Sequence, residues 1–230
     1  MINVIRYEDL GMANHGWLKA RHHFSFARYY DPQRMGFGAL RVVNDDIILA
    51  GAGFDMHPHA NMEIITYVRK GAITHRDSQG NKGRTEAGNV QVMSAGTGVY
   101  HSEFNLENED TKLYQIWIEP NKQNIEPAWD AHEFPKGATN ELTLLVSGDG
   151  KAPLSIQQDA RIYAGRLEQD AVLSHTVKHQ AYVLVSEGEI QLNGKALKAG
   201  DAAEATETKQ LKIIANSEAE ILVIDVPELN

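Results

Sequence analysis

The feature of this sequence that most constrains its fold is a succession of short apolar or alternating runs separated by Gly, Asp and Asn. Such runs predict β-strands, because alternate side chains of a strand face the core. They cover residues 40–43, 47–49, 63–68, 89–93, 113–118, 142–146, 161–167, 181–185, 189–192, 211–214 and 221–226. No segment keeps a helical period with capping residues, so we expect few, short helices, one of them within residues 121–132.

A segment rich in proline and glycine divides the chain into two parts. It spans residues 120–153, and its turn-forming residues are Pro120, Pro127, Pro135, Gly137, Gly148, Gly150 and Pro153. Proline and glycine interrupt regular structure, so this segment is interpreted as a crossover between two β-units. The sequence therefore predicts an all-β protein with an N-terminal domain of residues 1–135 and a C-terminal domain of residues 136–230, each an antiparallel sandwich or small barrel.

Composition narrows the classes of partner. The 230 residues include 22 Lys and Arg against 31 Asp and Glu, a formal net charge of −9, which disfavours direct binding to nucleic acid or anionic lipid. Because cysteine is absent, any metal must be bound by His, Asp or Glu. The first residues lack the apolar core of a secretory signal and no run is long enough for a membrane span, so a cytoplasmic location is expected.

The chemistry-bearing residues concentrate in the first half, which holds seven of the ten histidines. His57 and His59 form one alternating pair, and His101 and Glu103 form a second. Residues at i and i+2 of a strand point to one face, so each pair projects two ligands into the same space. Three imidazoles and one carboxylate suit a divalent first-row metal and leave two octahedral positions for substrate and a small co-ligand.

These residues resemble the motifs of the cupins. The first motif, G(X)5HXH(X)3–4E(X)6G, is matched by residues 51–71, with Glu63 at its glutamate and one extra residue before the last glycine. The second, G(X)5PXG(X)2H(X)3N, is approximated by residues 88–105, where Ser94 replaces the proline and two extra residues precede His101. These departures point to a subfamily.

Within the cupins, residues 14–32, 57–68 and 93–105 closely resemble the pirins in their bacterial quercetin 2,3-dioxygenase-like form. This resemblance implies a bicupin of two antiparallel jelly-roll barrels with one metal in the N-terminal barrel. It places His57, His59, His101 and Glu103 as ligands of Fe(II), with Mn, Co, Ni, Cu or Zn as alternatives. It also implies opening of a flavonol such as quercetin by O2, with release of carbon monoxide.

The residues leave two questions open. Either Glu103 or Glu63 could take the substrate proton; Glu63 reaches the metal only if residues 60–62 bend the chain back, since four extended residues span roughly 13 Å. The alternative to an enzyme is a metal-dependent regulatory or redox-sensing module that binds a protein partner, and a cupin-type isomerase is a third reading.

Other residues receive structural interpretations. We expect His15, His22 and His23 to belong to a packed aromatic stretch and His75 to lie in a solvated loop. Tyr67, Met93 and Trp117 fit either a cavity wall or the core, and His175 is not expected to bind metal.

Overall fold

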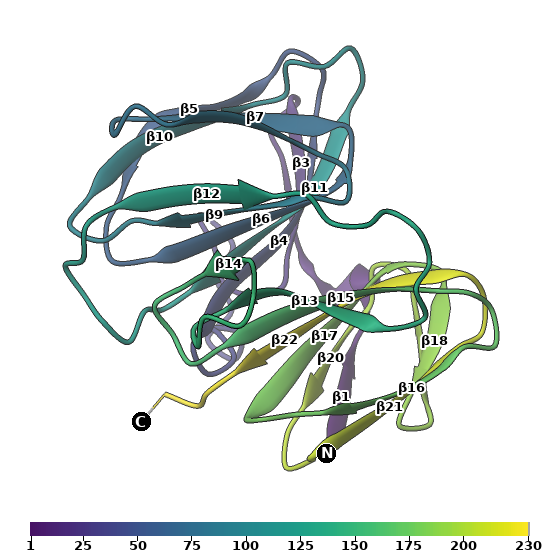
Figure 1. Cartoon of the computed structure of the whole chain (residues 1–230). Helices are drawn as coiled ribbons and strands as arrows, with labels where there is room; N and C mark the ends of the chain where they lie inside the picture. Colours follow the sequence, from purple (N-terminus) through teal and green to yellow (C-terminus); the bar gives the residue numbers. More distant parts are fainter. Residues whose placement is uncertain (230) are drawn as a thin grey trace. The chain divides into compact units, whose positions relative to one another are not determined.

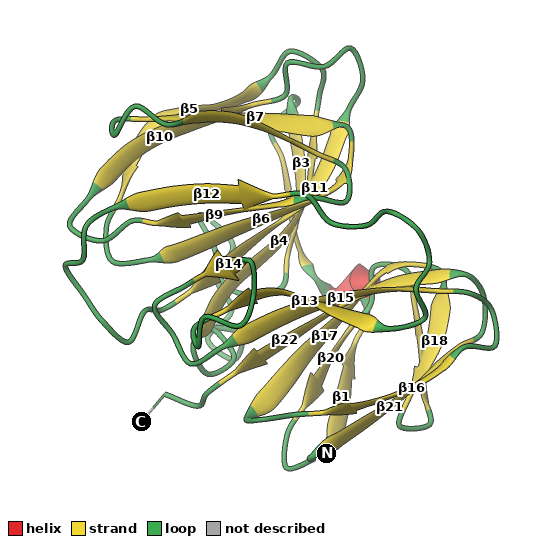
Figure 2. Ribbon diagram, in the orientation of Figure 1, coloured by secondary structure: helices red, strands yellow, loops and turns green. Residues whose placement is uncertain are grey.

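A computed structural model describes residues 1–229, and nearly all of its regular structure is β-strand (Figures 1 and 2). Within this range, the helical structure consists of the short 3-10 helix η1 (Tyr7–Asp9). No helix among the described residues has the length and apolarity required to cross a membrane.

The chain divides into two compact units. One contains Gly11–Pro135 together with Pro153–Gln158; the other contains Met1–Leu10, Lys136–Ala152 and the described residues from Asp159 onward. Residues 1–10 therefore belong to the second unit and residues 153–158 to the first, unlike the limits of 1–135 and 136–230 expected from the sequence. Whether each expected domain folds by itself stays a prediction. The N-terminal segment joins the second unit because Ile2 pairs with Ala205.

The first unit is a sandwich of two antiparallel sheets. The larger sheet has the order β12-β9-β6-β11-β4-β3-β2, and the smaller has the order β5-β10-β7-β8. The larger sheet comprises β2 (Gly11–Asn14), β3 (Leu18–His22), β4 (Leu40–Ile48), β6 (Glu63–Lys70), β9 (Val90–Ser94), β11 (Thr111–Ile118) and β12 (Ala128–His132). The smaller comprises β5 (Gly53–His59), β7 (Ala72–Asp77), β8 (Lys82–Glu86) and β10 (Val99–Phe104), and the short β14 (Leu154–Ser155) also belongs to this unit.

The two sheets of this unit share an apolar core. Ile73 of the smaller sheet packs with Leu18, Ile48, Val68 and Leu113 of the larger one. These side chains occupy alternate positions of their strands, which is why the sequence shows short alternating runs.

The second unit repeats the two-sheet arrangement. One sheet contains, in order, β1 (Ile2–Ile5), β20 (Ala202–Ala205), β17 (Gln180–Glu187), β22 (Ala219–Val226), β15 (Arg161–Leu167) and β13 (Leu142–Ser147). The other contains β16 (Val172–Thr176), β21 (Gln210–Ala215), β18 (Glu189–Leu192) and β19 (Lys195–Lys198). Val183, Ile213 and Val223 belong to the buried cluster between them.

The all-β prediction is confirmed, with the sheets forming jelly-roll-like sandwiches instead of closed barrels. Two details were wrong. The runs 40–43 and 47–49 form one strand, β4, whose middle carries three polar residues. The helix expected within residues 121–132 is absent, because β12 occupies residues 128–132 and pairs Trp129 with Met93 of β9.

Candidate metal centre and its cavity

Strands β5 and β10 bring three histidines together at one end of the smaller sheet. The strands are antiparallel, and His101 lies opposite His57 in their register. His59 follows His57 at i+2, and the ring centroids are 4.8 Å apart for His57 and His59, 4.4 Å for His57 and His101, and 5.0 Å for His59 and His101. One ring nitrogen of each lies within 4.8 Å of the others. The structure thus clusters the three histidines that the sequence selected.

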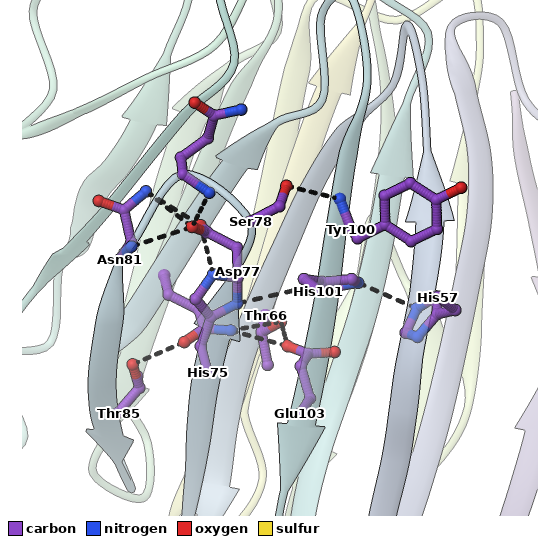
Figure 3. A network of polar contacts seen from close by, with 12 residues as sticks. His57, Thr66, His75, Asp77, Ser78, Asn81, Thr85, Tyr100, His101 and Glu103 are labelled. Atoms are coloured by element: carbon purple, nitrogen blue, oxygen red, sulfur yellow. Dashed lines mark hydrogen bonds and ion pairs between the residues drawn. The ribbon is translucent and has the colours of Figure 1, made fainter.

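A hydrogen bond orients the ring of His57, whose metal-facing nitrogen lies close to that of His101. The Nδ1–H of His57 donates to the backbone carbonyl of Asp55 at 2.6 Å, so its Nε2 carries the lone pair. That Nε2 lies 3.0 Å from the Nε2 of His101, and Figure 3 shows His101 between His57 and His75. The two Nε2 atoms therefore face a common point.

Burial lowers the pKa of two of these histidines, His59 and His101. Desolvation, followed by the positive charges of neighbouring imidazoles, lowers the pKa of His59 to about 4 and that of His101 to about 3. A neutral imidazole is the form that binds metals. The site consequently presents ligand-ready nitrogens at neutral pH.

Glu103 lies beside this cluster on β10 and is 3% exposed. Its Oε1 accepts hydrogen bonds from Gln91 Nε2 at 2.7 Å and Thr66 Oγ1 at 3.2 Å, and its Oε2 accepts from Gln115 Nε2 at 2.6 Å. A carboxylate offers about four acceptor positions, so three donors leave roughly one for a metal or a substrate proton. One Glu103 oxygen lies within 4.8 Å of ring nitrogens of His75 and His101, and Glu103 lines the same cavity as His57 and His59.

Glu63 has a different position. It begins β6, and Ile64, the next residue, lines the cavity, so the alternation of the strand directs Glu63 to the opposite face. There its Oε2 accepts a hydrogen bond from Ser94 Oγ at 2.6 Å. Burial raises the pKa of Glu63. The chain does turn at residues 60–62, where Asn61 adopts a φ of 48°, but that turn does not bring Glu63 to the histidines.

His75 corrects an expectation from the sequence. It was expected in a solvated loop, but it lies fully buried in β7. Its Nδ1 is 3.4 Å from the Nδ1 of His101, and its Nε2 is 2.9 Å from Oδ2 of Asp77 (Figure 3). The alternation of His75 with Asp77 on one strand was the signal that could have identified this pair.

The histidine cluster opens into a cavity of about 420 Å³ inside the first unit. Its walls are largely aromatic and aliphatic: Trp17, Leu18, Phe26, Phe54, Ile64 and Trp117. Trp117, for which the sequence allowed either a core or a cavity position, lines the cavity, and its ring centroid lies 4.9 Å from that of His59. Tyr67 and Met93 are instead buried and are not part of the cavity wall.

Polar residues of the larger sheet add hydrogen-bonding groups to this wall. His22, expected to be only packed, lines the cavity and its Nδ1 lies 2.8 Å from Oδ1 of Asn44. Asn44, Asp46 and Gln115 line it as well. Asn44 and Asp46 were not predicted from the sequence, although they interrupt the otherwise apolar strand β4 and this interruption was a visible signal.

In the second unit, the ring of His175 packs 4.6 Å from that of Tyr163. Among residues 1–229, the groups of three or more potential metal ligands are His57, His59 and His101, and His75, His101 and Glu103. His175 belongs to neither group.

Comparisons with known proteins agree with this arrangement. The Pirin family model matches residues 5–118, and the quercetinase C-terminal cupin domain model matches residues 144–226. The chain is 42% identical to a quercetin 2,3-dioxygenase of Escherichia coli, covering 99% of both chains, and 47% identical to a pirin-like protein of Caulobacter vibrioides, covering 98% of this chain and 99% of the relative. It also resembles the crystal structure of the Escherichia coli bacterial pirin YhhW in complex with nickel(II), with a TM-score of 0.94, 41% identity and full coverage of both chains.

Proposed function

The chain belongs to the pirin family of the cupin superfamily, and from that premise we propose that it is a metal-dependent dioxygenase that opens the heterocycle of flavonols such as quercetin with O2. The observation that carries this proposal is the histidine cluster at the wall of an aromatic cavity of about 420 Å³. Cavities of this size that combine apolar walls with a few polar groups are typical of sites for small ligands.

The side chains present fit one divalent metal. His57, His59 and His101 supply imidazoles whose ring nitrogens already converge, and Glu103 supplies a carboxyl oxygen from the same strand as His101. When bound, the metal would act as a Lewis acid toward the 3-hydroxyl oxygen of the flavonol and supply the electronic coupling to O2. We take Fe(II) as the first candidate, with Mn, Co, Ni, Cu and Zn to be compared, and the nickel complex of a related pirin supports a divalent ion at such a site.

The residues of the chain have separable roles in this reaction. The aromatic rings of Phe26 and Trp117, 5.4 Å apart and edge to face, provide an apolar surface for the flat flavonol. We propose Glu103 as the acceptor of the 3-hydroxyl proton, and its remaining acceptor capacity and its position in the cavity wall support this role. Glu63 is not placed for this role, since its carboxylate lies on the other face of β6.

Oxygen uptake by metal-loaded protein with quercetin tests the proposal. We expect O2 consumption that requires both metal and flavonol, together with release of carbon monoxide, and a perturbed flavonol absorption band under anaerobic conditions. His57→Ala should lose this activity, whereas His175→Ala in the second unit should keep it.

A different outcome would favour the regulatory alternative. If metal-loaded protein neither perturbs the flavonol spectrum nor consumes O2 with any flavonol tested, the dioxygenase proposal is wrong. Metal-dependent binding of a protein partner would then be the function to pursue.

A further inference from the structure

Behind the histidine cluster, His75 and Asp77 form a buried chain that ends on His101 (Figure 3). Their side chains are 0% and 1% exposed, respectively. They do not face the cavity, and the metal set described above does not include them. Their burial therefore calls for a role other than substrate contact.

The hydrogen-bond geometry assigns a proton to each nitrogen of this chain. If His101 binds a metal through Nε2, its Nδ1 carries the proton and donates to Nδ1 of His75 at 3.4 Å. His75 then carries its own proton on Nε2 and donates it to Asp77 Oδ2 at 2.9 Å. If Nδ1 of His75 were the donor instead, the proton of neutral His101 would sit on Nε2 and remove the lone pair from its metal-facing nitrogen.

Asp77 is in turn fixed by the turn that follows β7. Its Oδ1 accepts from the backbone N–H groups of Gln79 and Asn81, and the Nδ2 of Asn81 donates to Oδ2 at 2.9 Å. Burial opposes ionisation of Asp77, but hydrogen bonds from His75 and Asn81 hold its pKa below the ordinary value. The outer end of the chain is thus an anchored carboxylate.

The ring of His75 is fixed from the side by Trp129. The two rings are stacked, with centroids 5.0 Å apart and an interplanar angle of 11°. Trp129 can occupy this place because Gly83 faces it; a Cβ at Gly83 would lie 2.2 Å from the indole ring. The packing leaves His75 little rotational freedom.

We propose that His75 and Asp77 are positioning residues. They hold His101 in the tautomer and orientation needed to bind the metal, and they make His101 a stronger ligand. The inference rests on the metal site of the proposed function. A hydrogen bond from a ligating imidazole to an acceptor raises the basicity of that imidazole, and loss of such a partner typically costs about 10- to 100-fold in metal affinity or activity. Here the acceptor is Nδ1 of His75, and the hydrogen bond from the other ring nitrogen of His75 to Asp77 makes Nδ1 a better acceptor.

Four variants of the full chain test the inference with Co²⁺ as the probe. His75→Phe keeps a ring against Trp129 but removes both nitrogens, His75→Asn keeps an acceptor near the position of Nδ1, and Asp77→Asn keeps shape while removing charge. His132→Phe is the matched control, because His132 is an exposed histidine of the same unit whose ring also packs on an aromatic side chain, Phe134. Affinity is measured by competition with a chelator, and the site is observed through the visible absorption bands of Co²⁺.

We expect His75→Phe to weaken Co²⁺ binding by about 10- to 100-fold and to shift the absorption bands. His75→Asn should recover most of the affinity, Asp77→Asn should be intermediate, and His132→Phe should match the wild type. Wild-type affinity and spectrum in both His75→Phe and Asp77→Asn would overturn the inference; should His75→Phe fail to fold, Asp77→Asn decides alone. Failure of the wild-type protein to bind Co²⁺ would overturn both the inference and the metal site, whereas loss of the positioning effect alone leaves the dioxygenase proposal intact.

Discussion

Gln115 donates its Nε2–H to Oε2 of Glu103 across 2.6 Å, inside the first unit. Gln91 donates to the other carboxylate oxygen, so two buried amides hold Glu103 from both sides. Hydrogen bonds to a charged group are stronger than neutral ones and fix its direction. The proposed proton acceptor is therefore held in one orientation beside the histidines.

Removing one of these amides should impair catalysis. Gln115→Leu should lower the rate of quercetin-dependent O2 uptake by roughly 10-fold, because Glu103 loses a donor and its carboxylate can rotate. The matched control is Gln158→Leu, which removes another buried amide, one that donates to the carbonyl of Glu119. That variant should lose stability in a denaturant titration but keep the rate; equal rate losses in both would contradict a special role for Gln115.

The two glutamates should separate by role. Glu103→Gln should abolish turnover and weaken metal retention strongly, since a neutral amide no longer balances the charge of a dication. Glu63→Gln should keep the metal and lose activity only partly. Metal analysis and O2 uptake on the two purified variants provide the test, and metal loss in Glu63→Gln alone would show that this chain uses the general cupin glutamate.

Metal content should be one ion per chain, held only by residues before position 104. His57→Ala and His101→Ala should lose most of the metal, and His175→Ala should retain it. Metal analysis of protein purified without chelator measures this. Full occupancy in a variant with both His57→Ala and His59→Ala would disprove the site assignment.

The stability of the metal-free protein should fall in acid because of buried histidines. Burial lowers the folded-state pKa of His23 to about 3, of His59 to about 4 and of His101 to about 3. Below the unfolded value of about 6.5 the unfolded chain binds more protons than the folded chain, so stability decreases as the pH falls from there toward 3. Denaturant titrations between pH 7 and pH 4 should show this decline in the free energy of unfolding. Saturating metal should make the decline smaller, because it binds His59 and His101 in their neutral forms.

Asp46 should have the opposite effect on the pH dependence of stability, lowering the stability as the pH rises. It is 2% exposed, its Oδ1 has no hydrogen-bond partner, and burial followed by the charges of Asp45 and Glu103 raises its pKa well above the ordinary value. A carboxyl whose pKa is raised by folding destabilises the fold above the unfolded pKa of about 3.9. Asp46→Asn should therefore raise the unfolding midpoint at pH 7, and a lowered midpoint would show that the charge is compensated.

The sequence alone predicted the all-β architecture and the proximity of His57, His59 and His101. Period-two patterning reports which face of a strand is buried, and paired histidines at i and i+2 need only one neighbouring strand to meet. The surroundings of the site depended on register. Nothing local indicates that Gln91, Gln115 and Thr66 meet at Glu103, because they come from three strands that become neighbours only in the folded sheet.

The positions of His75 and Glu63 could not be predicted from the local sequence either. His75 was expected to lie in a solvated loop, but strand β7 extends to Asp77 and His75 is buried within it. Glu63 fits the cupin motif in sequence, but β6 begins at this residue and alternation turns it away from the cavity. A one-residue shift in the pairing register reverses the face of every side chain in a strand, and that register is set by the neighbouring strands.

The pairing of β1 with β20 has a consequence for how the protein is made. Ile2 lies opposite Ala205, so β1 can pair with β20 only after all the residues between these two positions have been synthesised. Contacts so distant in sequence form late and slowly, because the intervening loop must first be closed. Until then the edge of β20 that β1 covers in the folded sheet is unpaired, and an unpaired strand edge is a site for intermolecular association. Deletion of residues 2–5 should therefore lower the yield of folded protein, because it leaves the edge of β20 uncovered in the second unit, about 200 residues further along the chain.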